Sequence, residues 1–152
     1  MKLIRMIAMA LCVVIVLSAF SGCGGAAALD PDGTHTVTDH AGNAVEVPNT
    51  IDRIVVLDIY PVPAALSVFF GSASKIVGMA QPSMTAAQNS LLGQLYPDIL
   101  NAETGFIDGS EVNIEELMKL DPDVVFYSAG QTAQAELLAS AGIPALGISV
   151  NK

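Results

Sequence analysis

The sequence is poor in several residue types on which common protein functions depend. Its 152 residues include no tryptophan, two cysteines, two histidines, and six basic residues against fifteen acidic ones. Beyond residue 22 the imbalance grows, because four basic and fifteen acidic side chains leave a formal charge of −11. Phosphate backbones and anionic lipids repel such a body, so nucleic-acid binding is excluded. Two histidines are also too few for a histidine-rich metal site or for most histidine-based catalysis.

The motifs of the common enzyme classes are missing as well. No serine lies in a Gly-x-Ser-x-Gly elbow, no glycine-rich loop has the lysine of a P-loop, and nothing continues Asp30-x-Asp32 into a calcium loop. His40 beside Asp39 could hold a metal, but a solvated pair at a hairpin turn is the favoured interpretation. We therefore expect neither enzyme activity nor a cofactor.

What the sequence does have is apolar residues, since 52% of the chain is hydrophobic and 14% is charged. This composition excludes a disordered protein, and the length suits one domain with a packed core.

The N-terminus has the pattern of an export signal. Lys2 and Arg5 precede an apolar run, residues 6–20, and small residues follow. This order predicts a signal peptide over residues 1–22. An uncleaved signal anchor is the alternative, although the run is shorter than the roughly 20 residues that span a bilayer.

The segment after the signal is consistent with a lipid anchor. Phe20-Ser21-Gly22-Cys23 resembles the lipobox of bacterial lipoproteins, although an aliphatic residue is commoner than Phe20. That resemblance implies lipidation of Cys23, with the small residues of 23–33 as a tether. Cys12 lies inside the signal, so no disulfide framework is expected. The body, residues 34–152, is therefore expected outside the cytoplasm, on the cell surface or in the periplasm, anchored to the cytoplasmic membrane.

The body alternates between strand and helix patterns. Period-two runs flank a glycine-containing turn and predict a β-hairpin over residues 34–47. Asn113 has the position of a helix N-cap, with Glu116 three residues later as in a capping box. The fold class predicted is α/β: a Rossmann-like lobe with a mainly parallel sheet flanked by helices, preceded by the hairpin. Strands are expected at 54–57, 76–78, 124–127 and 145–150, and helices at 64–70, 85–96, 114–120 and 132–140.

Ligands of open α/β sheets bind beyond the carboxyl ends of the strands. Phenol rings there offer both stacking area and a hydrogen bond, although either tyrosine could instead pack in the core. The candidate ligand-binding residues that follow three strands are Asp58, Tyr60, Met79, Tyr127 and Gln131.

Three stretches of the body carry a family resemblance. Residues 36–57 hold an Asp-x-x-Gly hairpin, a proline and an Arg-Ile-Val strand; residues 112–125 hold an Asn-Ile-Glu helix and a Pro-Asp-Val strand; residues 141–144 read Ala-Gly-Ile-Pro. In this order and spacing they resemble the N-terminal lobe of the periplasmic-binding proteins of iron-siderophore, haem and vitamin B12 importers. The second lobe, and the helix that joins the lobes, have no counterpart in the 152 residues.

The resemblance implies a function without catalysis. Members of this family capture a ligand between two lobes and deliver it to an ABC permease, so a ferric chelate and the permease subunits are the implied partners. Glu115 matches the family's surface carboxylate that contacts arginines of the permease. The alternatives are a surface adhesion or sensor domain that reuses the lobe, and a non-functional fragment of a split binding protein. The ligand itself is not specified, and Arg53, the one arginine after residue 22, is expected away from the binding edge.

Overall fold

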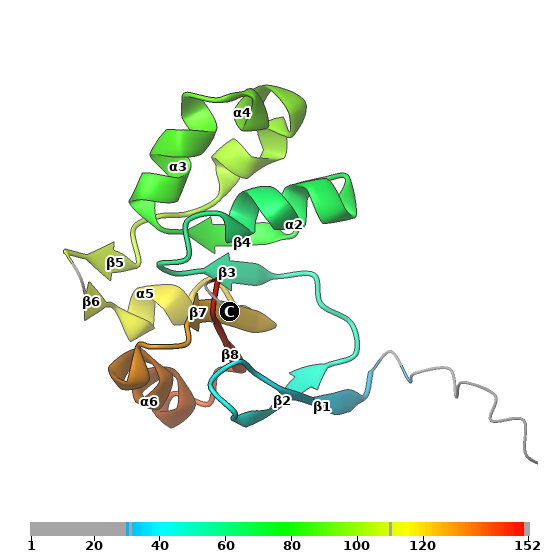
Figure 1. The fold of residues 1–152 in the computed structure, drawn as a ribbon, viewed down its shortest axis with the longest axis vertical. Helices are drawn as coiled ribbons and strands as arrows, with labels where there is room; N and C mark the ends of the chain where they lie inside the picture. The colour runs from blue at the N-terminus through cyan, green and yellow to red at the C-terminus, as the bar shows by residue number, and fades with distance from the viewer. Residues whose placement is uncertain (1–29, 31, 110, 151–152) are drawn as a thin grey trace, which may run out of the picture.

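A four-stranded parallel sheet forms the centre of the molecule in the computed structural model, which describes residues 30, 32–109 and 111–150 (Figure 1). The sheet order is β4 (Ile76–Met79), β3 (Ile54–Val56), β7 (Val124–Ser128) and β8 (Ala145–Ile148). All three neighbouring pairs are parallel. The α/β class predicted from the sequence is confirmed. The expected signal and Cys23 lie outside the described residues.

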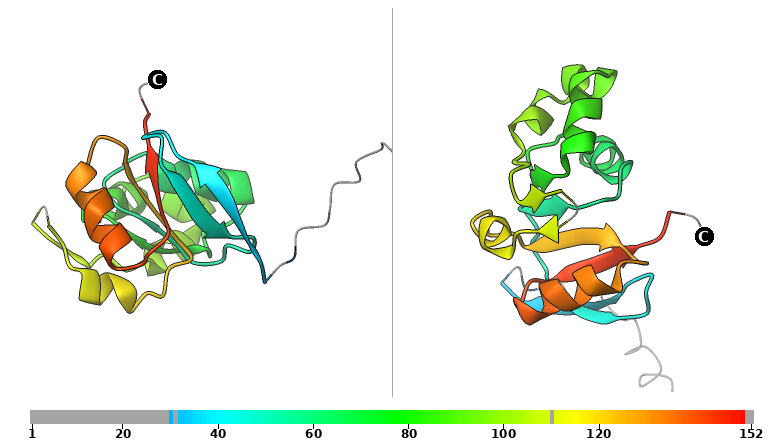
Figure 2. Two further views of the ribbon diagram at one scale, coloured as in Figure 1. Left: turned by 90° about the horizontal axis from the view of Figure 1, so that it is seen from below. Right: turned by 90° about the vertical axis from the view of Figure 1, so that its left-hand side faces the viewer.

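Alternation along the strands divides the core between the two faces of the sheet. Val55 and Val125 face the helices α5 (Ile114–Met118) and α6 (Thr132–Ser140) and pack with Leu117 and Leu138. Ile54 and Val124 face the opposite way, toward α2 (Val62–Phe70) and the hairpin. Figure 2 shows α5 and α6 on one side of the sheet and α2 on the other. Both faces are buried, which explains why these strands are continuous apolar runs.

The N-terminal hairpin is present with the predicted position. It consists of β1 (Thr34–Thr38) and β2 (Ala44–Pro48), and its turn lies against β8. The His40 amide donates to the Gly147 carbonyl at 2.9 Å, and the Gly147 amide donates to Oδ2 of Asp39 at 2.9 Å. The end of the expected tether is also held, because Asn49 Nδ2 donates to the Asp30 carbonyl at 2.6 Å.

The segment between β4 and β7 departs from the prediction. One helix was expected over residues 85–96, but the structure has α3 (Gln81–Gln88) and α4 (Leu91–Leu95), followed by the 3-10 helix η2 (Pro97–Asn101). Ser90 starts α4 because its side chain accepts a hydrogen bond from the Leu92 amide. The short strands β5 (Ile107–Asp108) and β6 (Glu111–Val112), which were not predicted, form a second hairpin.

The start of α5 is capped as expected, with one difference. Asn113 Oδ1 accepts from the Glu116 amide at 3.2 Å. The Glu116 carboxylate does not complete a capping box; it pairs with Lys119 at 2.6 Å.

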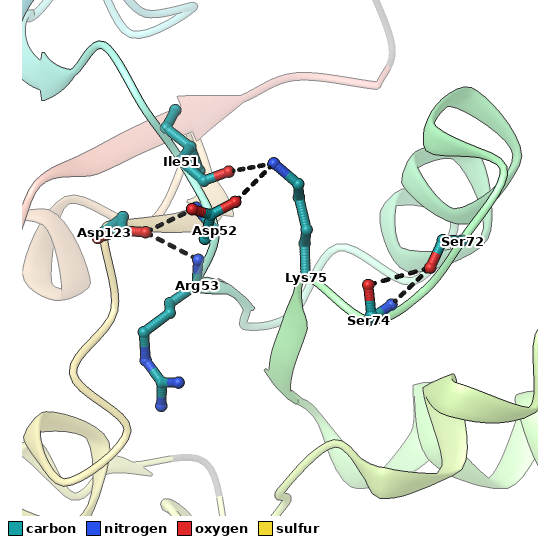
Figure 3. Close-up of polar contacts among 7 residues, drawn as sticks. All are labelled: Ile51, Asp52, Arg53, Ser72, Ser74, Lys75 and Asp123. Atoms are coloured by element: carbon teal, nitrogen blue, oxygen red, sulfur yellow. Dashed lines mark hydrogen bonds and ion pairs between the residues drawn. The ribbon is translucent and has the colours of Figure 1, made fainter. Parts of the chain in front are cut away.

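A polar cluster joins the amino ends of three strands (Figure 3). Oδ2 of Asp123 accepts from the amides of Asp52 and Arg53 at 2.7 and 2.8 Å. Lys75 binds Asp52 at 2.8 Å and the Ile51 carbonyl at 2.7 Å. These bonds fix the register of β3, β4 and β7 at the edge opposite the carboxyl ends.

Across the ranges that the structure describes, no helix is long and apolar enough to cross a membrane.

Candidate ligand-binding site

An open pocket lies at the carboxyl ends of β3, β4 and β7. Its volume is about 500 Å³. Segments far apart in the sequence meet there, because the carboxyl ends of parallel strands share one edge of a sheet. The twelve lining residues are Leu57, Asp58, Tyr60, Ala80, Gln81, Pro82, Ser83, Ile107, Gly109, Val112, Gln131 and Gln134.

Three of the five candidate binding residues lie in this pocket. Tyr60 precedes α2, and its ring is exposed, with 57% of the residue accessible. Asp58 follows β3 and accepts from the Ser128 amide at 3.1 Å, which holds its carboxylate between the ends of β3 and β7. Gln131 is the residue before α6, and its own amide donates to the Ser128 carbonyl at 2.8 Å. Ser128, the last residue of β7, is thus bonded to two of the residues that line the pocket.

The structure places the other two candidates in the core. Met79 is fully buried, and it packs with Met84 of α3 and Ile99 of η2. Tyr127 is 2% exposed and lies on the same side of β7 as Val125, packed against Leu138 of α6. The alternative that the sequence left open for Tyr127, packing beneath the following helix, is what the structure shows.

The Tyr127 hydroxyl points to the hairpin turn rather than to the pocket. It donates to Oδ2 of Asp39 at 3.4 Å, and the same oxygen accepts from the Gly147 amide. Burial and the nearby Asp39 charge raise the pKa of Tyr127. Burial alone would raise the pKa of Asp39, but the hydrogen bonds from Gly147 and Asn43 outweigh it and lower the pKa. A buried carboxylate with several donors is stable as an anion, so this contact fixes the hairpin to β8.

Of the pair His40 and Asp39, the histidine is exposed, as expected, but the aspartate is not. The Ser149 amide donates to Nδ1 of His40 at 2.9 Å, and Asp39 is buried. Among the described residues, no group of three or more histidine, cysteine or acidic side chains is placed to hold a metal ion.

Three polar residues of the pocket were not among the candidates: Gln81, Ser83 and Gln134. Gln81 is the first residue of α3, and Ser83 and Gln134 are the third residues of α3 and α6. Pro82 is the signal that could have placed the start of α3, since proline favours the first helical turn. Gln134 has no such signal, because the N-cap of α6 is Gln131 and not the Ser, Thr, Asp or Asn that marks a helix start.

Asp58 is the one charged residue among the twelve that line the pocket. Arg53 lies elsewhere, as expected: its Nε donates to the carbonyls of Leu120 and Asp121 at 2.8 and 3.0 Å. The pocket therefore offers hydroxyl, amide and aromatic groups rather than cations.

Glu115 is exposed in the first turn of α5 and is not a lining residue of the pocket. The neighbouring Glu116 is engaged by Lys119, so Glu115 is the acidic group of this turn without an ion pair in the described structure.

A parallel-sheet lobe with an open pocket at its carboxyl edge has the architecture of half of a two-lobed binding protein. Comparison with solved structures agrees. A periplasmic solute-binding protein from Veillonella parvula is 33% identical, with a TM-score of 0.73 over 79% of this chain and 36% of its own. The molybdate-binding protein MolA of a Haemophilus influenzae ABC transporter is 27% identical, with a TM-score of 0.63 over 76% of this chain and 35% of its own.

More distant neighbours show the same fold. The petrobactin-binding protein YclQ from Bacillus subtilis is 19% identical, with a TM-score of 0.52 over 78% of this chain and 38% of its own. No protein-family model matches the chain, and no curated protein matches it significantly. The chain thus has the fold of one lobe of the periplasmic solute-binding proteins of ABC importers, which confirms the resemblance drawn from its motifs. It spans about a third of the length of the solved structures that it matches.

Proposed function

We propose that this lobe is part of an exported, lipid-anchored binding protein that captures an iron complex, such as a ferric siderophore or haem, for an ABC permease. It acts by binding and release, without catalysis. The neighbours support capture of a solute, and their own ligands include molybdate and petrobactin. The pocket provides the ligand-facing groups, and a second lobe would close over it.

The convergence of three strand ends on one open pocket carries this proposal. Tyr60 projects an exposed ring there, and Asp58 and Gln131 lie beside it. An exposed aromatic ring beside polar groups suits a large, flat or oxygen-rich complex, because it combines contact area with hydrogen bonds. The pocket is open, so one lobe covers one face of a ligand. Affinity for the isolated lobe is therefore expected to be weak.

Calorimetric titration of the full chain with ferric citrate tests the binding step. Replacing Tyr60 by alanine removes an exposed ring and leaves the core intact, so heat of binding should fall to the level of dilution. Phe69→Ala is the matched control, because Phe69 is exposed and is not a lining residue of the pocket. Equal heats for the wild type and Tyr60→Ala would favour the adhesion or sensor alternative over this pocket as the ligand site.

We further propose that Glu115 contacts arginines of the permease. It is exposed, it lies in the first turn of α5, and the lobe around it is strongly acidic. Opposite charges across an interface increase association, and reversing one charge converts attraction into repulsion. In a two-lobed binding protein that carries this lobe, Glu115→Arg should abolish ATP-coupled uptake and leave ligand affinity in solution unchanged.

The control for that experiment is Glu136→Arg, which reverses an exposed carboxylate on α6, a different helix. Uptake at the wild-type rate with Glu115→Arg, or an equal loss with Glu136→Arg, would contradict a docking role for Glu115.

The anchor is a proposal about residues 1–33 of the chain. Lipidation of Cys23 would retain the protein in the membrane fraction, because two or more acyl chains give stable anchoring. Cys23→Ala should then release the body into the soluble fraction or leave it with its signal attached. Mass spectrometry of the mature N-terminus distinguishes these cases, and an unmodified Cys23 in the wild type would contradict the proposal.

A further inference from the structure

Two helices begin at the pocket, and in neither does the N-cap side chain accept a hydrogen bond from the first turn. The N-cap residue of α3 is Ala80 and that of α6 is Gln131, and neither makes a side-chain cap hydrogen bond. The first-turn amides of a helix have no acceptor within the helix, and they carry a partial positive charge. In α3, Pro82 has no amide hydrogen and the Ser83 amide donates to the Ala80 carbonyl at 2.9 Å, so Gln81 is the amide donor of that start. Residues of both starts line the pocket. The pocket therefore has two sources of positive potential although no basic side chain lines it.

The third residue of each helix adds a second observation. Ser83 is 5% exposed and its Oγ has no hydrogen-bond partner; Oε1 of Gln134 is likewise buried and without a partner. In the described part of the chain these are the two buried side-chain polar atoms without a partner, and both residues line this pocket. An unsatisfied buried polar group is destabilising, so native proteins rarely keep one without a reason. A bound ligand would supply the missing partners.

The chemistry of these groups favours an acceptor. The Ser83 hydroxyl can donate one hydrogen bond. A 180° rotation of the Gln134 side-chain amide brings Nε2, which is a donor, to the position of Oε1. The helix amides can only donate. Asp58 opposes an anion, but it is exposed to water and already accepts from the Ser128 amide, so its field in the pocket is screened.

We propose that the starts of α3 and α6, with the Ser83 hydroxyl and the Gln134 amide, form a cradle for an anionic oxygen group. The group is either a free tetrahedral oxyanion or a carboxylate of a metal chelate. This inference rests on the proposed function, because it names the chemical group that the same pocket binds. Neutral donors hold the charge here, and lysine and arginine take no part.

Amide chemical shifts of the ¹⁵N-labelled full chain in a non-ionic detergent test the cradle, because they locate even weak binding. Sodium molybdate is the probe for a free oxyanion, and gallium citrate is a diamagnetic probe for a chelate carboxylate. With at least one of them, the largest shifts are expected at the amides of Gln81, Thr132 and Gln134. The probe that produces them identifies the source of the oxygen group.

Three variants sharpen the test. Ser83→Ala should weaken binding roughly tenfold, the effect of losing a hydrogen bond to a charged group. Ser140→Ala, at the far end of α6, is the matched control and should bind as the wild type does. Asp58→Asn should strengthen binding about threefold, because it removes a like charge from the pocket.

Shifts absent from both helix starts with both probes, or equal affinity for Ser83→Ala and Ser140→Ala, would overturn the cradle. Weaker binding by Asp58→Asn would also overturn it. If the helix starts do not respond while ferric citrate still binds in a Tyr60-dependent way, the proposed function stands and the cradle fails. If ferric citrate does not bind either, both fail.

Discussion

Replacing Asp39 by alanine should destabilise the fold strongly, although Asp39 lies in a hairpin turn. Its carboxylate accepts from the Asn43 amide at 2.8 Å, the Gly147 amide at 2.9 Å and the Tyr127 hydroxyl at 3.4 Å. Asp39 and Tyr127 are buried, so water cannot take the place of the lost oxygen without a change in structure.

The size of the effect follows from the donors left behind. A buried donor without an acceptor costs about 1–3 kcal/mol. The cost of leaving the Gly147 amide unpaired lies in the upper part of that range because its hydrogen bond is short. The cost for the Tyr127 hydroxyl lies in the lower part because its hydrogen bond is long. Asn43 lies at an exposed turn and can turn to water. The free energy of unfolding should therefore fall by about 3 kcal/mol, a large part of the 5–15 kcal/mol of a typical domain. Asp39→Asn keeps one acceptor oxygen and should lose about half as much.

Urea unfolding followed by far-UV circular dichroism measures this effect, because the chain has no tryptophan. Asp98→Ala is the control, since Asp98 is an exposed acid at the start of η2, where the expected loss is below about 0.5 kcal/mol. An Asp39→Ala variant as stable as Asp98→Ala would show that the turn is not held to β8 through this carboxylate.

Three further predictions concern stability. The pKa of Asp39 is lowered in the folded state, so the Asp39 charge stabilises the fold above pH 3.8, the ordinary value, and this stabilisation is lost as pH falls through the folded pKa. Asp39→Asn should therefore flatten the dependence of the unfolding free energy on pH below about pH 4. Gly78→Ala should cost about 1–3 kcal/mol in urea unfolding, because its Cβ would lie 2.8 Å from Cδ1 of Leu120, whereas Gly105→Ala, with no atom within 4 Å, should be neutral. Asn113→Ala should lower the thermal midpoint by an amount equivalent to about 1 kcal/mol through loss of the α5 cap.

The sequence was sufficient to predict the elements whose signal is local. β3 and β7 are apolar runs that begin with β-branched residues, and Asn113 caps α5 as its position predicted. The break between α3 and α4 was missed because residues 85–96 hold no internal proline, and the stop depends on Ser90 as a new N-cap. The β5–β6 hairpin was missed because each strand is two residues long, too short for a period to show.

The placement of the candidate side chains at the pocket could be predicted where exposure follows from the loop, and could not where it depends on tertiary packing. Tyr60 follows a strand and precedes a proline, so its ring lies outside the sheet. Tyr127 is still within β7, two residues after Val125, and therefore shares its buried side. Met79 is the last residue of β4 and is covered by α3 and η2, which the sequence did not place there. Ser83 and Gln134 became candidates only when the pocket showed both helix starts together.

The central claim is that the ligand binds at the carboxyl edge of the sheet. Paramagnetic broadening of amide signals by ferric citrate, with gallium citrate as the diamagnetic reference, tests it directly, since high-spin iron broadens only nearby amides. We predict selective loss of the Tyr60, Gln81 and Gln131 signals, with the Arg53 amide at the opposite edge unaffected. Uniform broadening, or broadening centred on Arg53, would contradict the account.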